Sequence, residues 1–332
     1  MFLKPQHKII IALLTSSIQA QTTQICDSTS NATTNSGRYT FFPDVVATDD
    51  SGYQCTDFTL ADDTTTNTTL FTTTFSWSGT DANTSTPHSF PSLTLNLPSI
   101  LPIPISNISL LPLTNNWALY PGNPLSTISS TSASSLQNVS VIAACYLTLY
   151  LDLTPETSQN ASLAATKIII WQASYGGLLP LGYTSTSTSI SRPSINLAGI
   201  TYTLYTSQSS PSTQTQTTWG TRAPAVPQTV YSWYPDSNTS SLTAMDVSPL
   251  LNYLWREVYV DSGTYVGYVE WGLDARHATG NVTWSVYEVG MNVKRGTPVK
   301  AVGGGAGRDR EVGRGEMVGL VVCLVGAVVL FG

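Results

Sequence analysis

The sequence predicts an all-β protein, a two-sheet antiparallel sandwich of jelly-roll type with one short helix. Segments rich in β-branched and aromatic residues recur along the chain, and clusters of Gly, Pro, Asn or Ser separate most of them. No strand-like segment alternates regularly with a helical one, which argues against a parallel sheet. With 332 residues, 41% of them hydrophobic, the chain can bury a sizeable core.

Nine segments are expected to be strands because they are rich in β-branched and aromatic residues and several alternate in polarity. In chain order they are residues 38–42, 69–79, 92–97, 139–153, 167–173, 199–206, 229–235, 264–273 and 282–293. The expected helix, 248–258, reads SPLLNYLWREV. Ser248 can cap its first turn, Pro249 suits its first position, and its apolar residues have helical spacing. No repeat or linker divides residues 26–293.

The N-terminus has the pattern of a signal peptide over residues 1–20. Lys4 and Lys8 precede the apolar run IIIALL, and Ala20 suits cleavage. Eight Asn-x-Ser/Thr sequons follow along the chain, and they predict a glycosylated, extracellular protein. They are Asn31, Asn67, Asn83, Asn107, Asn138, Asn160, Asn238 and Asn281.

The C-terminus predicts a lipid anchor at the cell surface. A polar, Gly-rich stretch over residues 294–316 precedes an apolar tail over 317–332, the order of a glycosylphosphatidylinositol signal. Gly305, Ala306 and Gly307 are the expected attachment region, and the tail would be removed. The alternative is a permanent transmembrane helix, but a tail of 16 residues is short for a span of about 20 and no basic residues follow it.

Composition and cysteines narrow the function classes. Only 10% of residues are charged and the net charge is −6, which excludes a basic patch for nucleic acid. Cys26 and Cys55 can pair in an oxidising compartment, and Cys145 is expected to be a buried free thiol. No cysteine or histidine has metal-ligand spacing, and His7, His88 and His277 look too dispersed to form a site. We therefore expect neither a metal nor a cofactor.

The order of several short motifs resembles glycoside hydrolase family 12. From Cys26 onwards these are SGRYTFF, SGYQC, FSWSG, IIIWQASYGGLLP and INLAGITYTLY, followed by the helix and two final strands. The resemblance covers nearly all of residues 21–293. It implies a concanavalin-like β-sandwich that hydrolyses β-1,4-glucan or xyloglucan with retention, using two glutamates that face each other. Retention requires carboxyl groups about 5 to 5.5 Å apart.

Carried over residue by residue, the resemblance places a lysine where the nucleophile belongs. The family nucleophile precedes the strand tryptophan, here Trp171, by four residues, and that position is Lys167. An amine cannot form the glycosyl ester, and its charge opposes a cation-like transition state. No Asp or Glu occurs in residues 163–172, so a shift of register restores none. The alternative is a surface lysine on an unrelated sandwich.

The acid/base position matches Asp274 without a gap, or Glu270 with one. If the strand is regular, residues 270, 272 and 274 share a face and its two acids lie about 13 Å apart, too far for a retaining pair. Asp152 lies on the polar face of its own strand and is expected to support the site. We expect Lys167 to pair with Asp152, Asp274 or Glu270, because a buried ammonium needs an opposite charge. Each acid can equally be an ordinary surface carboxylate.

Sugar binding depends on aromatic faces rather than on a nucleophile. The expected sugar-stacking residues are Trp77, Trp171, Tyr175, Trp233 and Trp271, although each tryptophan can equally be a core residue. Two functions remain open. One is a non-hydrolytic, lipid-anchored protein that binds β-glucan or xyloglucan. The other is an active glycosidase with rearranged acids, such as Asp152 with Asp274, at the wider spacing of about 6.5 to 9.5 Å that inversion requires.

Overall fold

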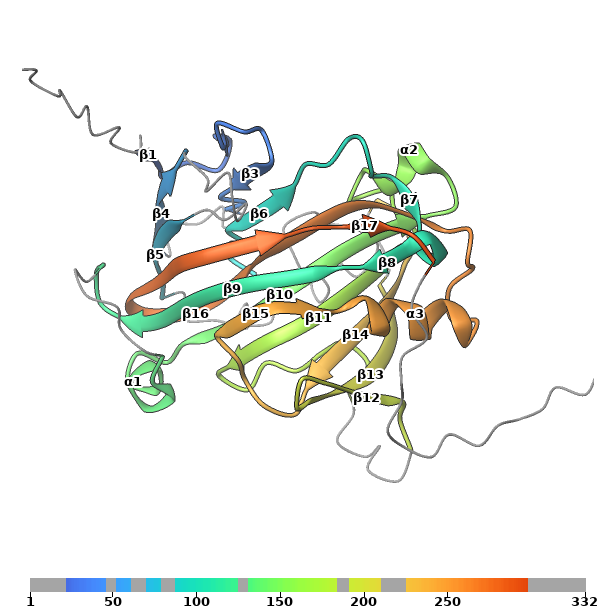
Figure 1. Ribbon diagram of the computed structural model, residues 1–332. Coiled ribbons are helices and arrows are strands. Elements are labelled where there is room, and N and C mark those ends of the chain that lie inside the picture. The colour runs from blue at the N-terminus through green and yellow to red at the C-terminus, as the bar shows by residue number, and fades with distance from the viewer. Residues whose placement is uncertain are drawn as a thin grey trace, which may run out of the picture. The chain divides into compact units, whose positions relative to one another are not determined.

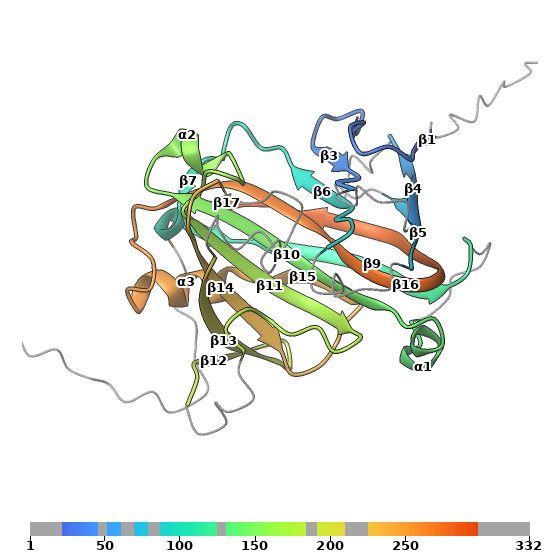
Figure 2. The same ribbon diagram turned by 180° about the vertical axis from the view of Figure 1, so that it is seen from behind.

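Two β-sheets packed face to face form the protein, as the sequence predicts. The computed structural model describes residues 22–45, 52–60, 70–78, 87–124, 131–183, 191–209 and 225–297, and Figures 1 and 2 show their arrangement from opposite sides. All of these residues belong to one compact unit.

We call the two layers sheet A and sheet B. Sheet A consists of β1 (Thr22–Ile25), β4 (Gly52–Thr59), β5 (Phe71–Trp77), β9 (Pro112–Pro121), β15 (Ser241–Asp246) and the second half of β16 (Tyr265–Met291). Sheet B consists of β2 (Ala32–Thr33), β3 (Tyr39–Phe42), β6 (Ser92–Leu95), β7 (Ile103–Pro104), β10 (Ile142–Asp152), β11 (Thr166–Tyr175), β12 (Ser194–Leu197), β13 (Ile200–Ser209), β14 (Gln228–Pro235) and the first half of β16. A separate pair joins β8 (Ile108–Leu110) to β17 (Lys294–Arg295).

The strand β16 belongs to both layers. Its first residues pair with β10 in sheet B, and its last residues pair with β9 in sheet A. The expected strands 264–273 and 282–293 are therefore one continuous strand, and the register shift between Ala278 and Val282 marks its passage between the sheets. This strand carries both predicted acids on the half that belongs to sheet B.

The hydrophobic core lies between the two sheets and contains a buried amide. The Oε1 atom of Gln172 accepts hydrogen bonds from Asn115 Nδ2 and from Trp271 Nε1, and the Cys145 thiol donates to the same oxygen at 3.7 Å. Asn115 lies on β9, so this contact links the layers. Because a buried polar group is costly unless it is paired, the shared oxygen helps to define how the two sheets pack.

The predicted helix is α3 (Ser248–Arg256), and its Pro249 stands in the first turn as expected. The capping residue differs from the expectation. Ser248 is already helical and makes no cap, whereas Asp246 Oδ1 accepts the Ser248 backbone N–H and Asp246 Oδ2 accepts its hydroxyl. The described residues also contain three shorter helical segments that were not predicted: α1 (Ala133–Gln137), α2 (Pro155–Ser158) and the 3₁₀ turn η2 (Ile105–Asn107).

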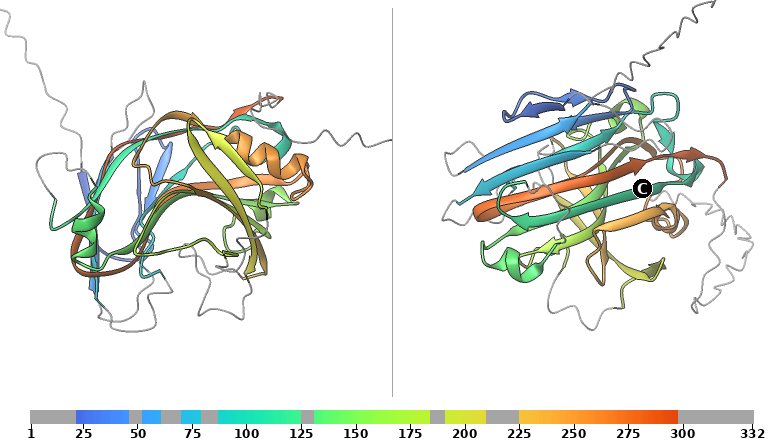
Figure 3. Two further views of the ribbon diagram at one scale, coloured as in Figure 1. Left: turned by 90° about the horizontal axis from the view of Figure 1, so that it is seen from below. Right: turned by 60° about the vertical axis from the view of Figure 1, so that its left-hand side comes forward.

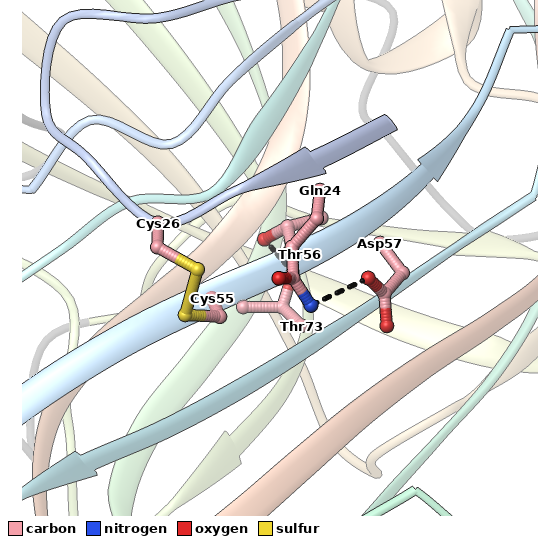
Figure 4. Close-up of a disulfide and its surroundings, with 6 residues drawn as sticks. All are labelled: Gln24, Cys26, Cys55, Thr56, Asp57 and Thr73. Carbon is pink, nitrogen blue, oxygen red and sulfur yellow. Dashed lines mark hydrogen bonds between the residues drawn. A yellow bond between two sulfur atoms is a disulfide. The ribbon is translucent and has the colours of Figure 1, made fainter. Parts of the chain in front are cut away.

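The predicted disulfide between Cys26 and Cys55 is present and ties the segment after β1 to β4 (Figure 4). Beside it, Gln24 Nε2 donates to Asp57 Oδ1, and the hydroxyls of Thr56 and Thr73 bond to each other. Cys145 is a buried free thiol, as predicted, and burial raises its pKa.

The signal peptide, the attachment region at Gly305, Ala306 and Gly307, and the apolar tail lie outside the described residues. No helix in the described ranges is long and apolar enough to span a membrane. Among the sequons within those ranges, Asn281 is partly buried and the others are exposed: Asn31, Asn107, Asn138, Asn160 and Asn238.

Candidate functional site

Sheet B is bent, and its concave side faces away from sheet A (Figure 3). We call this side the concave face. Register defines its rows: Lys167 lies opposite Tyr150, and Trp171 lies opposite Tyr146. One row crosses five strands and consists of Tyr205, Ser232, Ile169, Thr148 and Glu270. Because side chains alternate along a strand, residues two apart on each strand share this face.

Lys167 lies on the concave face and is buried, with 3% of its surface exposed. Its Nζ atom lies 5.1 Å from the centre of the Tyr150 ring. Burial lowers the pKa of Lys167 from 10.5 to about 8, and the charges of Glu270 and then Asp274 act in the opposite direction. A solvated surface lysine is therefore the wrong interpretation, and carboxylates lie close enough to stabilise its charged form.

The two predicted acids share the concave face, as expected, but have different surroundings. Asp274 is fully buried and forms a salt bridge of 2.9 Å with Arg276 Nη2, and Arg276 Nε also donates to it. Tyr146 donates a long hydrogen bond of 3.5 Å to the same carboxylate. Glu270 is 2% exposed. Its charge has a larger effect on the pKa of Lys167 than the charge of Asp274 has. The sequence analysis did not anticipate Arg276.

Asp152 does not support Lys167. Its carboxylate accepts the backbone N–H groups of Thr154 and Ala165, so it stabilises the turn at the end of β10. Asp274 lies opposite Ala144, eight residues from Asp152 along β10, which corresponds to about 27 Å. The suggested catalytic pair of Asp152 and Asp274 is therefore wrong on distance alone.

Four of the expected sugar-stacking residues face the core. Trp77, Trp233 and Trp271 are at most 1% exposed and belong to the cluster between the sheets. Trp77 stacks on His88, and Trp271 packs against Trp284. Successive side chains on a strand point to opposite faces of the sheet, so Trp233 and Trp271 must face away from their chain neighbours Tyr234 and Glu270. This alternation is the sequence signal that could have excluded both tryptophans from the concave face.

Tyr175 faces the core because of a β-bulge. Tyr146 pairs with Trp171 but Cys145 pairs with Ala173, so Gln172 is an extra residue in β11. The bulge reverses the parity of the residues that follow it. Tyr175 packs against the core, and burial raises its pKa to about 12.

Trp171 does lie on the concave face, within a series of aromatic rings that we call the aromatic row. Successive ring centres lie 5.2 to 6.4 Å apart. In order, the members are Phe90, Tyr146, Trp171, Tyr234, Tyr205 and Tyr183. Trp171 itself is fully buried, whereas Tyr183 is 41% exposed and Tyr205 and Tyr234 are half-buried. The guanidinium of Arg192 lies 4.6 Å above the Tyr205 ring.

The concave face also carries buried hydroxyls. Ser92 Oγ, Thr148 Oγ1 and Ser232 Oγ are buried and have no hydrogen-bond partner in the described part of the chain. Thr148 and Ser232 belong to the row that contains Tyr205 and Glu270. Unsatisfied polar groups are rare in folded proteins, and several on one face indicate a place where water or a polar ligand binds.

Two depressions are lined by described residues, and Lys167 is not among the lining residues of either. A groove of about 610 Å³ runs between the β12–β13 turn and β15, and a pocket of about 260 Å³ includes Thr94 and Tyr268.

Among the described residues, no group of three or more His, Cys, Asp or Glu can hold a metal. The histidines are less dispersed than expected, because His88 lies near enough to His277 to affect it. Burial lowers the pKa of His277, and the charge of His88 lowers it as well.

Chemically, this arrangement does not match a retaining glycosidase. The position expected for the nucleophile holds an amine, and the two acids that the described residues place on this face, Glu270 and Asp274, lie four residues apart on one strand, about 13 Å between their Cα atoms. That separation exceeds even the roughly 6.5 to 9.5 Å of an inverting pair. The face does combine aromatic rings with hydroxyls, the two kinds of group that bind uncharged sugars.

Comparison with solved structures shows that the chain has the jelly-roll fold of the family 12 glycoside hydrolases. Endoglucanase 3 of Trichoderma harzianum matches with a TM-score of 0.58 at 18% identity, over 83% of this chain and 99% of that one. Humicola grisea Cel12A matches with the same score and identity, over 82% and 99%. The family 12 xyloglucanase of Bacillus licheniformis also scores 0.58, at 14% identity over 82% and 100%. No protein-family model matches the sequence, and no curated protein does.

Proposed function

We propose that this protein is an extracellular, non-hydrolytic relative of the family 12 enzymes that binds β-glucan or xyloglucan and is held at the cell surface by a C-terminal lipid anchor. The observation that carries the proposal is Lys167, buried on the concave face where the resemblance expects the nucleophile. Glu270, whose charge most affects Lys167, is the better match for the former acid/base position. Asp274 is already engaged by Arg276.

The binding surface in this proposal is the outer part of the aromatic row. Tyr183, Tyr205 and Tyr234 have exposed or half-buried rings, whereas the deeper members are buried. A sugar ring that stacks on Tyr205 would lie beside the buried hydroxyl of Ser232, the register partner of Tyr205. Aromatic faces and unsatisfied hydroxyls together give affinity and orientation for a neutral polysaccharide. These tyrosines replace the four core-facing residues that the sequence suggested.

The test combines binding with hydrolysis. The purified protein is run through gels that contain β-glucan or xyloglucan, and reducing ends are measured in the same polysaccharides. We expect retarded migration without release of reducing ends. Tyr205→Ala should abolish the retardation, whereas Tyr53→Ala, which removes an exposed ring from sheet A, should not change it.

Two results would contradict this function. Absence of retardation in every polysaccharide would remove the binding proposal. Release of reducing ends that disappears in Glu270→Gln would instead establish the glycosidase with rearranged acids. Activity gained only by Lys167→Glu would show that the face is a hydrolase site silenced at this one position.

A further inference from the structure

The end of the molecule beyond α3 exposes apolar and aromatic side chains. We call the last turn of α3, residues 257–262 and β17 the α3 end. Val258 is 84% exposed and Tyr259 is 40% exposed. Trp255 is half-buried, whereas every other described tryptophan is at most 2% exposed. A partly exposed tryptophan next to an exposed tyrosine and an exposed valine is unusual on a surface that contacts only water.

Val258 keeps its exposed side chain in a strained backbone conformation. The helix ends with Tyr259 N donating to Leu254 O, and Val258 has a φ of 60°. Glycine is the usual residue at this position, and a β-branched side chain in the left-handed region is unfavourable. Folding alone would favour glycine here, so an apolar side chain held outward indicates a contact outside the chain.

Contacts with neighbouring residues hold the aromatic rings of the α3 end in place. Tyr253 and Tyr259 stack with centres 6.1 Å apart, and Tyr231 donates its hydroxyl hydrogen bond to the Tyr259 carbonyl. The guanidinium of Arg256 lies 5.1 Å from the Trp255 ring. The exposed surface is therefore ordered rather than a loose loop.

The chain leaves the fold beside this surface. Gly296 N donates to Asn107 O, and Ser109 Oγ donates to Lys294 O, so the last described residues lie along η2 and β8. The same two elements contact the helix side: Ser248 Oγ donates to Ser109 O, and Ser106 N donates to Ser262 O. Figure 1 shows β17, β8 and α3 at the same end of the molecule.

The distance to the expected anchor is short. The described chain ends at residue 297, and the proposed attachment region begins at Gly305. Fully extended, the eight residue steps from 297 to 305 reach about 26 to 29 Å. The attachment residue therefore lies within that distance of the exit beside the α3 end, and only the anchor's own glycan separates it from the bilayer.

The charge of the α3 end also suits a lipid surface. Arg256, Lys294 and Arg295 are exposed there, against the acidic Glu257 and Asp261. In the whole chain, 14 basic residues face 20 acidic ones, so this end is less acidic than the rest. Aromatic residues together with Arg and Lys are typical of protein surfaces at the headgroup level of membranes.

We propose that the α3 end rests on the bilayer that holds the anchor, with Trp255, Val258 and Tyr259 at the level of the lipid headgroups. This inference depends on the lipid anchor of the proposed function. The contact fixes which side of the protein faces the membrane and turns the far end, with β4, away from it.

Tryptophan emission tests this orientation. The mature, lipid-bearing protein, carrying Trp219→Phe, is reconstituted into phosphatidylcholine vesicles with or without bromine near the glycerol end of the acyl chains. We expect bromine to quench part of the emission, and Trp255→Phe to lose that quenching. A matched control adds Tyr53→Trp to the Trp255→Phe protein, and this exposed ring on β4 should not be quenched. Val258→Gly should weaken the quenching while raising the Tm.

The outcomes separate the two proposals. Protein that floats with the vesicles without quenching at Trp255 keeps its anchor and overturns the orientation. Equal quenching at residues 53 and 255 also overturns it. Protein that does not float with the vesicles overturns the anchor and, with it, this inference.

Discussion

The ammonium of Lys167 lies against the ring of Tyr150, its direct partner in the register of β10 and β11, with Nζ 5.1 Å from the ring centre. This contact explains how a lysine can occupy a buried position on the concave face of sheet B. The ring stabilises the positive charge from one side, and the charge of Glu270 does so as well. The position therefore depends on a set of neighbours, and each of them can be tested.

Replacing Tyr150 should lower the pKa of Lys167 further. Tyr150→Leu removes the ring, and the loss of a desolvated cation–π contact corresponds to about one pKa unit. Tyr150→Phe keeps the ring and should leave the pKa of Lys167 near that of the unmodified protein. NMR titration of the lysine side chain measures this difference. An equal shift in both variants would show that the hydroxyl, and not the ring, stabilises the charge.

Removing the ammonium should reveal its coupling to Glu270. Because burial outweighs the attraction of the nearby charges and lowers the pKa of Lys167, Lys167→Met alone should cost less unfolding free energy than the roughly 3–5 kcal/mol of breaking a fully compensated buried pair. Glu270→Gln alone leaves the ammonium buried without that anion and should cost more than the double variant Lys167→Met, Glu270→Gln, which removes both charges. Urea unfolding of the unmodified protein, the two single variants and the double variant measures the coupling. Additive losses in the double variant would show that the two residues do not interact.

Stability should rise with pH between about 8 and 10.5. The pKa of Lys167 is lowered from 10.5 to about 8 in the folded protein. In this window the unfolded chain therefore binds more protons at this lysine, and deprotonation favours the folded state. The free energy of unfolding from urea titrations should increase more steeply across this window in the unmodified protein than in the double variant. Identical slopes would mean that folding leaves the pKa of this lysine unchanged.

Gly272 should not tolerate a larger residue. A Cβ there would lie 2.7 Å from Pro91 O and 3.0 Å from Phe90 Cζ, the ring at the buried end of the aromatic row. Gly272→Ala should therefore destabilise by about 1–3 kcal/mol, or about 2–4 °C in Tm for each kcal/mol. Gly280→Ala is the control, because its Cβ would find Val139 at 3.6 Å. Calorimetry measures the Tm of both variants. Equal Tm values would show that residues 90 and 91 move aside to accommodate the new methyl group at little cost.

Most of the strands that the sequence predicts are present because they depend on local patterns. The expected segments correspond to β3, β5, β6, β10, β11, β13, β14 and β16. The long strand β9 was missed, since PLTNNWALYP begins and ends with proline and carries two asparagines, which disfavour a strand prediction. It lies beside β16 and β15, where pairing on both sides outweighs its weak local preference.

The sequence by itself determined the β class, the cysteine pair and the presence of a lysine without any nearby acid in residues 163–172, because all three are properties of residue order and composition. The tertiary structure decided which side chains share the concave face. The bulge at Gln172 turns Tyr175 to the core, and register brings Tyr205, Ser232 and Glu270 into one row from three different strands. Such parity depends on the pairing of strands, a long-range property that no local pattern encodes.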